Sequence, residues 1–78
     1  MLNVLVITPQ EVLYEGPATG IILPGEQGVF EILEHHKRLI SRLFTGNVTI
    51  DDKTFSIRRG MVTVEEDKVT IVIENLSE

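Results

Sequence analysis

The sequence predicts an all-β domain, built as a two-layer antiparallel β-sandwich or flattened barrel. Through the second half of the chain, apolar residues alternate with polar ones at a period of two, which is typical of strands with one buried face. Glycine, proline and paired acidic residues interrupt these runs at short intervals, as turns do. Because no long segment has helical periodicity, strands are expected to pack against strands.

The first half of the chain predicts three strands that are apolar on both faces, as strands inside a sandwich are. They lie at residues 2–7, 12–14 and 21–23. Turns are predicted between them, because proline fixes the φ angle and glycine allows positive φ where a chain reverses. These residues are Pro9, Gly16, Pro17, Gly20, Pro24 and Gly25.

Residues 39–44 interrupt the strand pattern, because their apolar residues recur at i, i+1, i+4 and i+5. This spacing predicts a single helical turn whose apolar side plugs the sandwich. Residues 46–74 then read as an antiparallel meander, with apolar residues alternating on each strand. Its breaks are predicted at Asp51-Asp52, Arg59-Gly60 and Glu66-Asp67.

Composition limits the protein to one domain over residues 1–78 and excludes several functions. A chain of 78 residues buries only about 60% of its unfolded surface, so its stability margin should be thin. The net charge of −5 argues against nucleic acid or anionic lipid as the main ligand. The chain has no cysteine, no signal peptide and no apolar run of about 18 residues. We therefore expect a cytoplasmic protein that is not inserted in the membrane.

No group of residues predicts catalysis or cofactor binding. His35 and His36 lie near Glu31 and Glu34, but adjacent side chains point apart on a strand or a helix, so a metal site is not expected. The serines lack a neighbouring base, and the paired acids fall on solvated turns. The glycines of residues 25–28 flank an acid and precede a strand, which is unlike a phosphate loop. We expect no metal, no cofactor and no small-molecule substrate.

The order and spacing of residues 25–48 resemble the most recognisable stretch of the ATP synthase epsilon subunit. Residues 8–16 are similar to the family's short second strand, and residues 60–64 with 68–72 to its closing hairpin. The central match reads Gly25-x-x-Gly28-x-Phe30-x-Ile32-Leu33-x-x-His36-x-x-Leu39-Ile40-Ser41, followed by Gly46-x-Val48.

The resemblance implies a non-catalytic subunit at the foot of the central stalk of a rotary ATP synthase. Such a subunit packs against the gamma subunit and touches the c-ring, and it helps to couple proton or sodium transport to ATP synthesis. It is held at the inner face of the cell membrane through the complex. Carried over by position, the ring-facing loop comprises Gly25, Glu26, Gln27, Gly28, Val29, Phe30, Glu31 and His36, with Val29 and Phe30 as an exposed apolar tip.

Departures from the family pattern occur where glycine or proline is common, at Glu31, Glu34, His35 and Arg38. Many relatives also continue into a two-helix C-terminal domain, and as a departure from that pattern we expect this chain to lack such a domain. An alternative function is a free-standing β-sandwich adaptor that binds a protein by adding a strand to a sheet edge. A small enzyme that is completed by a neighbouring subunit is a third possibility.

Overall fold

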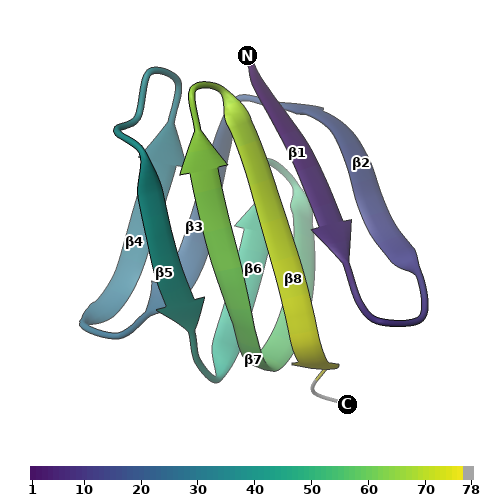
Figure 1. Cartoon of the computed structure of the whole chain (residues 1–78). Coiled ribbons are helices and arrows are strands. Elements are labelled where there is room, and N and C mark those ends of the chain that lie inside the picture. Colours follow the sequence, from purple (N-terminus) through teal and green to yellow (C-terminus); the bar gives the residue numbers. More distant parts are fainter. Residues whose placement is uncertain (77–78) are drawn as a thin grey trace.

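The computed structural model describes residues 1–76, and this part of the chain forms eight strands and no helix (Figure 1). The all-β prediction is confirmed. The strands are β1 (Leu2–Ile7), β2 (Val12–Ala18), β3 (Gly20–Gly25), β4 (Gly28–Leu33), β5 (Leu39–Leu43), β6 (Gly46–Ile50), β7 (Lys53–Glu65) and β8 (Lys68–Leu76).

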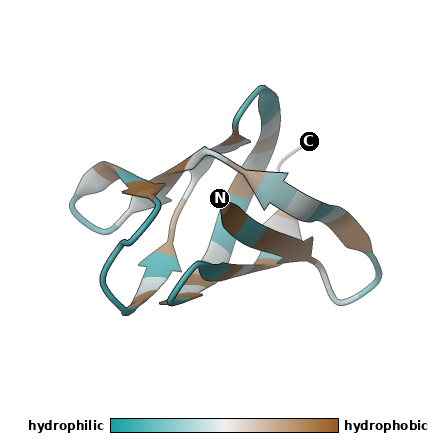
Figure 2. Cartoon of the chain, turned by 90° about the horizontal axis from the view of Figure 1, so that it is seen from above, coloured by the Kyte–Doolittle hydropathy of each residue, from teal (hydrophilic) through white to brown (hydrophobic). Residues whose placement is uncertain are grey.

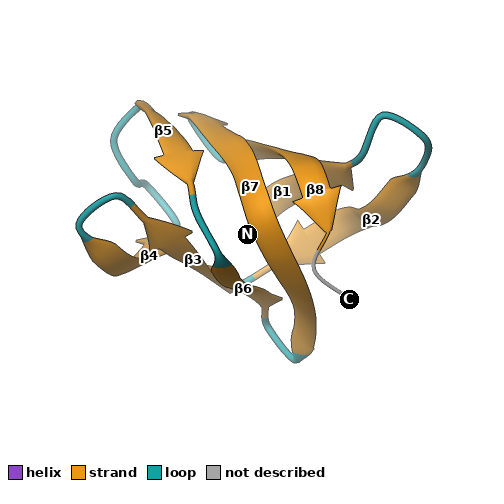
Figure 3. Cartoon of the chain, turned by 90° about the horizontal axis from the view of Figure 1, so that it is seen from below, coloured by secondary structure: helices purple, strands orange, loops and turns teal. Residues whose placement is uncertain are grey.

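The strands form one hydrogen-bonded sheet that folds over on itself. Its order is β2-β1-β8-β7-β6-β3-β4, with β5 paired to β7 as a branch. The first half of β7 pairs with β6, and its second half pairs with β5 and β8. Seen from below, β7 passes from one layer to the other (Figure 3). The result is the predicted sandwich, with a front layer (β5, the second half of β7, β8, β1, β2) and a back layer (β4, β3, β6, the first half of β7).

The sheet does not close into a barrel. No ladder joins β4 to β5 within the described residues, so the two edges face each other across an open seam. One end of the seam is bridged by a hydrogen bond of 2.9 Å, which the Phe44 N–H donates to the Pro24 carbonyl.

The predicted meander is confirmed as β6, β7 and β8, but one of its breaks is wrong. Two breaks are the expected turns, and Asp51 and Glu66 there have φ angles of 51° and 56°. The third prediction, Arg59-Gly60, lies inside β7, where the register against β8 shifts and the strand bulges. A glycine in a strand marks a bulge as readily as a turn.

Two further expectations are corrected. Residues 39–44 do not form a helical turn, because β5 runs through them with Leu39 and Leu43 facing inward and Ile40 facing out. A strand with apolar groups on both faces gives the same spacing as a helical turn. The sheet is also not wholly antiparallel, since β1 lies parallel to β8 with Val4 opposite Val69.

The core lies between the two layers and consists only of apolar side chains. Alternate residues of β1 and of the second half of β7 point inward, and the hydropathy along the ribbon is banded accordingly (Figure 2). In the described part of the chain no polar or charged side chain is buried. The largest fully buried side chains include Leu2, Ile21, Leu23, Ile32, Leu43, Ile50, Ile57, Ile71 and Ile73.

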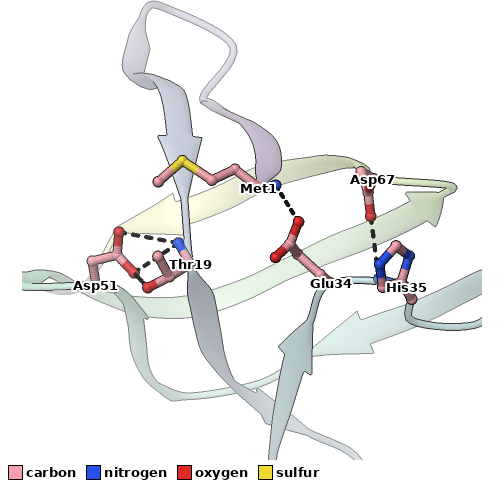
Figure 4. Close-up of polar contacts among 6 residues, drawn as sticks. All are labelled: Met1, Thr19, Glu34, His35, Asp51 and Asp67. Carbon is pink, nitrogen blue, oxygen red and sulfur yellow. Dashed lines mark hydrogen bonds and ion pairs between the residues drawn. The ribbon is translucent and has the colours of Figure 1, made fainter.

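A hydrogen-bonded carboxylate fixes the corner between β2 and β3, where the chain passes from the front layer to the back layer (Figure 4). The Asp51 carboxylate accepts hydrogen bonds from the Thr19 N–H at 3.0 Å, the Thr19 hydroxyl at 2.7 Å and the Gly20 N–H at 3.1 Å. The hydroxyl bond, followed by the two backbone bonds, lowers the pKa of Asp51 despite some opposing desolvation. The corner between β2 and β3 is thereby fixed to the turn between β6 and β7.

The stabilising effect of Asp51 is expected to depend on pH. Because its pKa is lower in the folded than in the unfolded chain, its contribution should be complete at neutral pH, begin to fall below about pH 4 and vanish below the folded-state pKa. The variant Asp51→Asn tolerates the left-handed backbone and removes the charge. Urea midpoints of wild type and variant should differ at pH 7 and converge under strongly acidic conditions. The matched variant Asp52→Asn should lack this effect, and an equal shift from both variants would contradict the assignment.

Candidate partner-binding site at the β3–β4 hairpin

The predicted ring-facing loop forms a tight hairpin between β3 and β4. Gly25 pairs with Gly28 across the turn Glu26-Gln27, and β4 has already begun at Gly28. Gly28 has a φ of 115°, a region that side chains rarely enter. A Cβ at Gly25 would lie 2.6 Å from the ring of Phe30. Both glycines are therefore required for this turn.

Only one of the two residues predicted to form an exposed apolar tip is in fact exposed. Val29 is 74% exposed, whereas Phe30 is half-buried and packs against the core over Gly25. Successive residues of a strand point to opposite sides, so the two side chains cannot share one face. Of the two residues predicted to form the apolar tip, only Val29 is exposed.

Most of the predicted residues surround one surface hollow of about 550 Å³, which we call the hairpin hollow. It lies at the open seam, between the hairpin and β5, and brings His36 together with the turn. The hollow is lined by Glu26, Gln27, Gly28, Val29, Phe30, His36, Leu39 and Ser41.

The residues predicted from the sequence differ from those that line the hairpin hollow at four positions. Gly25 lies beneath Phe30 rather than in the lining. Glu31 points to the opposite face of the back layer, where it borders a separate hollow with Thr19 and Asp51. Leu39 and Ser41 line the hairpin hollow but were not predicted. Strand alternation along β5 is the signal that would have placed Leu39 and Ser41 together on one face.

His36 is held at the rim of the hollow by its own loop. Its Nδ1 lies 2.8 Å from the Lys37 carbonyl, which can only accept, so Nδ1 carries the proton. The imidazole is half-buried and oriented, while Nε2 is not used by this bond. An oriented imidazole beside an apolar floor suits recognition of a polar group on another protein.

Two carboxylates near His35, those of Glu34 and Asp67, are engaged in polar contacts (Figure 4). The Met1 amino group donates to Glu34, and this hydrogen bond raises the pKa of the amino group. The His35 N–H donates to Asp67 at 3.2 Å. Within residues 1–76, no three histidine, aspartate or glutamate side chains converge as metal ligands would. This part of the chain also has no helix that could span a membrane.

The whole chain, residues 1–78, matches the family model described as the β-sandwich domain of the ATP synthase delta/epsilon chain. An ATP synthase epsilon chain of Sulfurimonas denitrificans is 36% identical over 94% of this chain and 60% of its own length. The epsilon chain of Leptospira borgpetersenii is 33% identical over 95% and 61%. The chain therefore spans about 60% of the length of these relatives.

A similar fold occurs in a solved rotary assembly. The cryo-EM structure of the central stalk and c-ring of the Tetrahymena thermophila mitochondrial ATP synthase contains a chain that superposes with a TM-score of 0.81. The alignment covers 99% of this chain and 66% of that one, at 16% identity. Identity this low establishes a likeness of fold.

Proposed function

The chain belongs to the family of ATP synthase delta/epsilon chains through their β-sandwich domain, and from that membership we propose that it is a central-stalk subunit linking the gamma subunit to the c-ring. In this role the chain itself catalyses no reaction. It turns with the ring and helps to couple proton or sodium transport to ATP synthesis at the inner face of the cell membrane.

The single observation that carries the proposal is the hairpin hollow. It joins an exposed apolar residue, Val29, to polar groups on Glu26, Gln27 and His36 around the half-buried Phe30. An apolar centre with a polar rim is the usual composition of a protein interface. We assign this surface to the polar loops of the c-ring.

The fold supports a load-bearing role because the docking residues lie on rigid elements. The turn has two residues, and its glycines are fixed by the ring of Phe30 and by the pairing of β3 with β4. The core behind it is apolar and close-packed, and such interiors resist compression. A force applied at Val29 is therefore transmitted to the whole domain.

The proposal predicts that an acid at Val29 uncouples the enzyme. In membranes whose ATP synthase depends on this chain, Val29→Asp should reduce ATP-driven ion pumping several-fold while ATP hydrolysis continues, because a charge would be desolvated against the ring. Val29 is 74% exposed in the free domain, so folding should be unaffected. Fluorescence quenching of a pH- or sodium-sensitive dye, beside a phosphate-release assay, measures both activities.

The matched control is Val12→Asp, which places the same charge at an exposed valine of β2, outside the hairpin hollow. It should pump like the wild type. Equal pumping by Val29→Asp and the wild type would refute ring docking at this hollow. Equal losses in both variants would indicate a general effect of charge and would refute it too.

A further inference from the structure

The loop between β4 and β5, which carries His36, is attached at two points to the tip of the β7–β8 hairpin. The His35 N–H donates a hydrogen bond of 3.2 Å to the Asp67 carboxylate, which lies 32 residues further along the chain (Figure 4). At the other end of the loop, Arg38 forms an ion pair of 3.1 Å with Glu65. His36 therefore lies between two contacts with one distant hairpin.

Asp67 makes the stronger of the two attachments. It is half-buried, and its carbonyl oxygen accepts a hydrogen bond of 2.7 Å from the Asn3 N–H of β1, so its own position is fixed. Its carboxylate gives the bond to the loop the added strength of a charged acceptor. The Arg38 and Glu65 side chains are both largely exposed, and ion pairs of this kind contribute little.

The backbone of His35 requires such an attachment. Its φ angle is 64°, in the left-handed region that residues other than glycine rarely adopt. Asp51 and Glu66 also have positive φ, but each lies in a two-residue hairpin turn that imposes this conformation. His35 lies between strands, outside such a turn. A conformation of this kind persists where the surrounding structure holds it, and the Asp67 carboxylate is the group that contacts the His35 N–H.

We propose that Asp67 is a positioning residue for the partner-binding site. By holding the His35 N–H, its carboxylate fixes the left-handed bend that directs the next side chain, His36, to the rim of the hairpin hollow. The proposal rests on ring docking at that hollow, as given above, and adds a residue that is not part of its lining.

The expected benefit is that the site is ordered before the partner binds. Without the carboxylate, His35 would relax toward the ordinary φ region, and the imidazole of His36 would leave its place beside Glu26 and Ser41 in the lining. Docking would then have to order the loop as well, and ordering costs affinity. The bond between the His36 Nδ1 and the Lys37 carbonyl orients the ring only when the loop has this path.

The first test is nuclear magnetic resonance of the full chain. Asp67→Ala removes the acceptor for the His35 N–H but keeps the carbonyl that binds Asn3, and the φ of Asp67 is not positive, so alanine is not strained there. The His35 amide should exchange with D2O at least about tenfold faster. The imidazole ¹⁵N signals of His36 should change from the Nδ1–H tautomer to the mixture of a free histidine. Circular dichroism verifies the fold.

Two matched variants separate the hydrogen bond from the charge. Asp67→Asn keeps an acceptor oxygen while it removes the charge, so both signals should stay like the wild type. Glu66→Asn removes the neighbouring charge in the same turn and tolerates the left-handed backbone, so it should also leave both signals unchanged.

The second test is ATP-driven ion pumping in membranes, measured beside ATP hydrolysis as for Val29→Asp. Asp67→Ala should reduce pumping several-fold while hydrolysis continues, and Asp67→Asn and Glu66→Asn should pump like the wild type. If Asp67→Ala leaves both His36 and pumping unchanged, the inference is refuted, and ring docking stands as long as Val29→Asp uncouples. If Val29→Asp also pumps like the wild type, ring docking at the hollow fails with it.

The remaining outcomes also overturn the inference. Release of His36 without a loss of pumping would mean that its position does not serve docking. Equal losses in Asp67→Ala and Asp67→Asn would mean that charge, rather than this hydrogen bond, is responsible, and equal losses in Glu66→Asn would indicate a general disturbance of the turn. Unfolding of Asp67→Ala would show that the carboxylate supports the whole domain instead of the site.

Discussion

Replacing Gly60 with alanine is expected to lower the free energy of unfolding by about 1–3 kcal/mol, the usual cost of overpacking, and valine by more. A Cβ at this position would lie 2.6 Å from the Val72 carbonyl oxygen and 3.4 Å from the Ile73 Cα. Both atoms belong to the backbone of β8, so no side-chain rotation relieves the contact. A domain of this size has only about 4–12 kcal/mol of total stability. Urea denaturation followed by circular dichroism measures the loss.

Thr63→Ala is the matched control for Gly60, because it alters an exposed, outward-facing residue three positions along the same strand. It should change the free energy of unfolding by no more than about 0.5 kcal/mol. If Gly60→Ala were as stable as Thr63→Ala, the close approach of β7 and β8 at the bulge would be disproved.

Truncation of Ile71 to alanine is expected to cost about 2–5 kcal/mol, because its fully buried side chain would leave a cavity between the layers. The next residue provides the control. Val72 is on the same strand but faces outward, so Val72→Ala should cost less than about 1 kcal/mol. Thermal denaturation of both variants gives the comparison, and similar losses would mean that β8 does not have the alternation described above.

The strands of the second half could be predicted because a period of two leaves few alternatives. Val69, Ile71 and Ile73 can all be buried on one side only if the chain is extended. Residues 39–44 could not be assigned in this way, since β5 carries apolar groups on both faces and strand and helix give the same pattern. The parallel pairing of β1 with β8 depends on how segments distant in the sequence come together, and no local sequence pattern indicates this.

The candidate site was predicted in part, and only through the family resemblance. The order of glycines placed Gly28 to Phe30 and His36 together, and the hairpin hollow contains them all. Glu31 was included in the predicted site because it is close in sequence to these residues. Its side chain instead borders a separate hollow. Arg42 and Arg59 belong to a cluster of basic residues that the sequence indicates as a local patch, and both line one surface hollow. They lie together because β5 and β7 are neighbours.

Strand β7 has a consequence for how the domain comes apart. Its thirteen residues hydrogen-bond to β6 in the back layer and to β5 and β8 in the front layer. Unfolding of either layer would therefore remove hydrogen-bond partners from the strands of the other layer. Neither layer has a complete core by itself. The domain should therefore lose its structure in one cooperative transition, with no stable half-folded state.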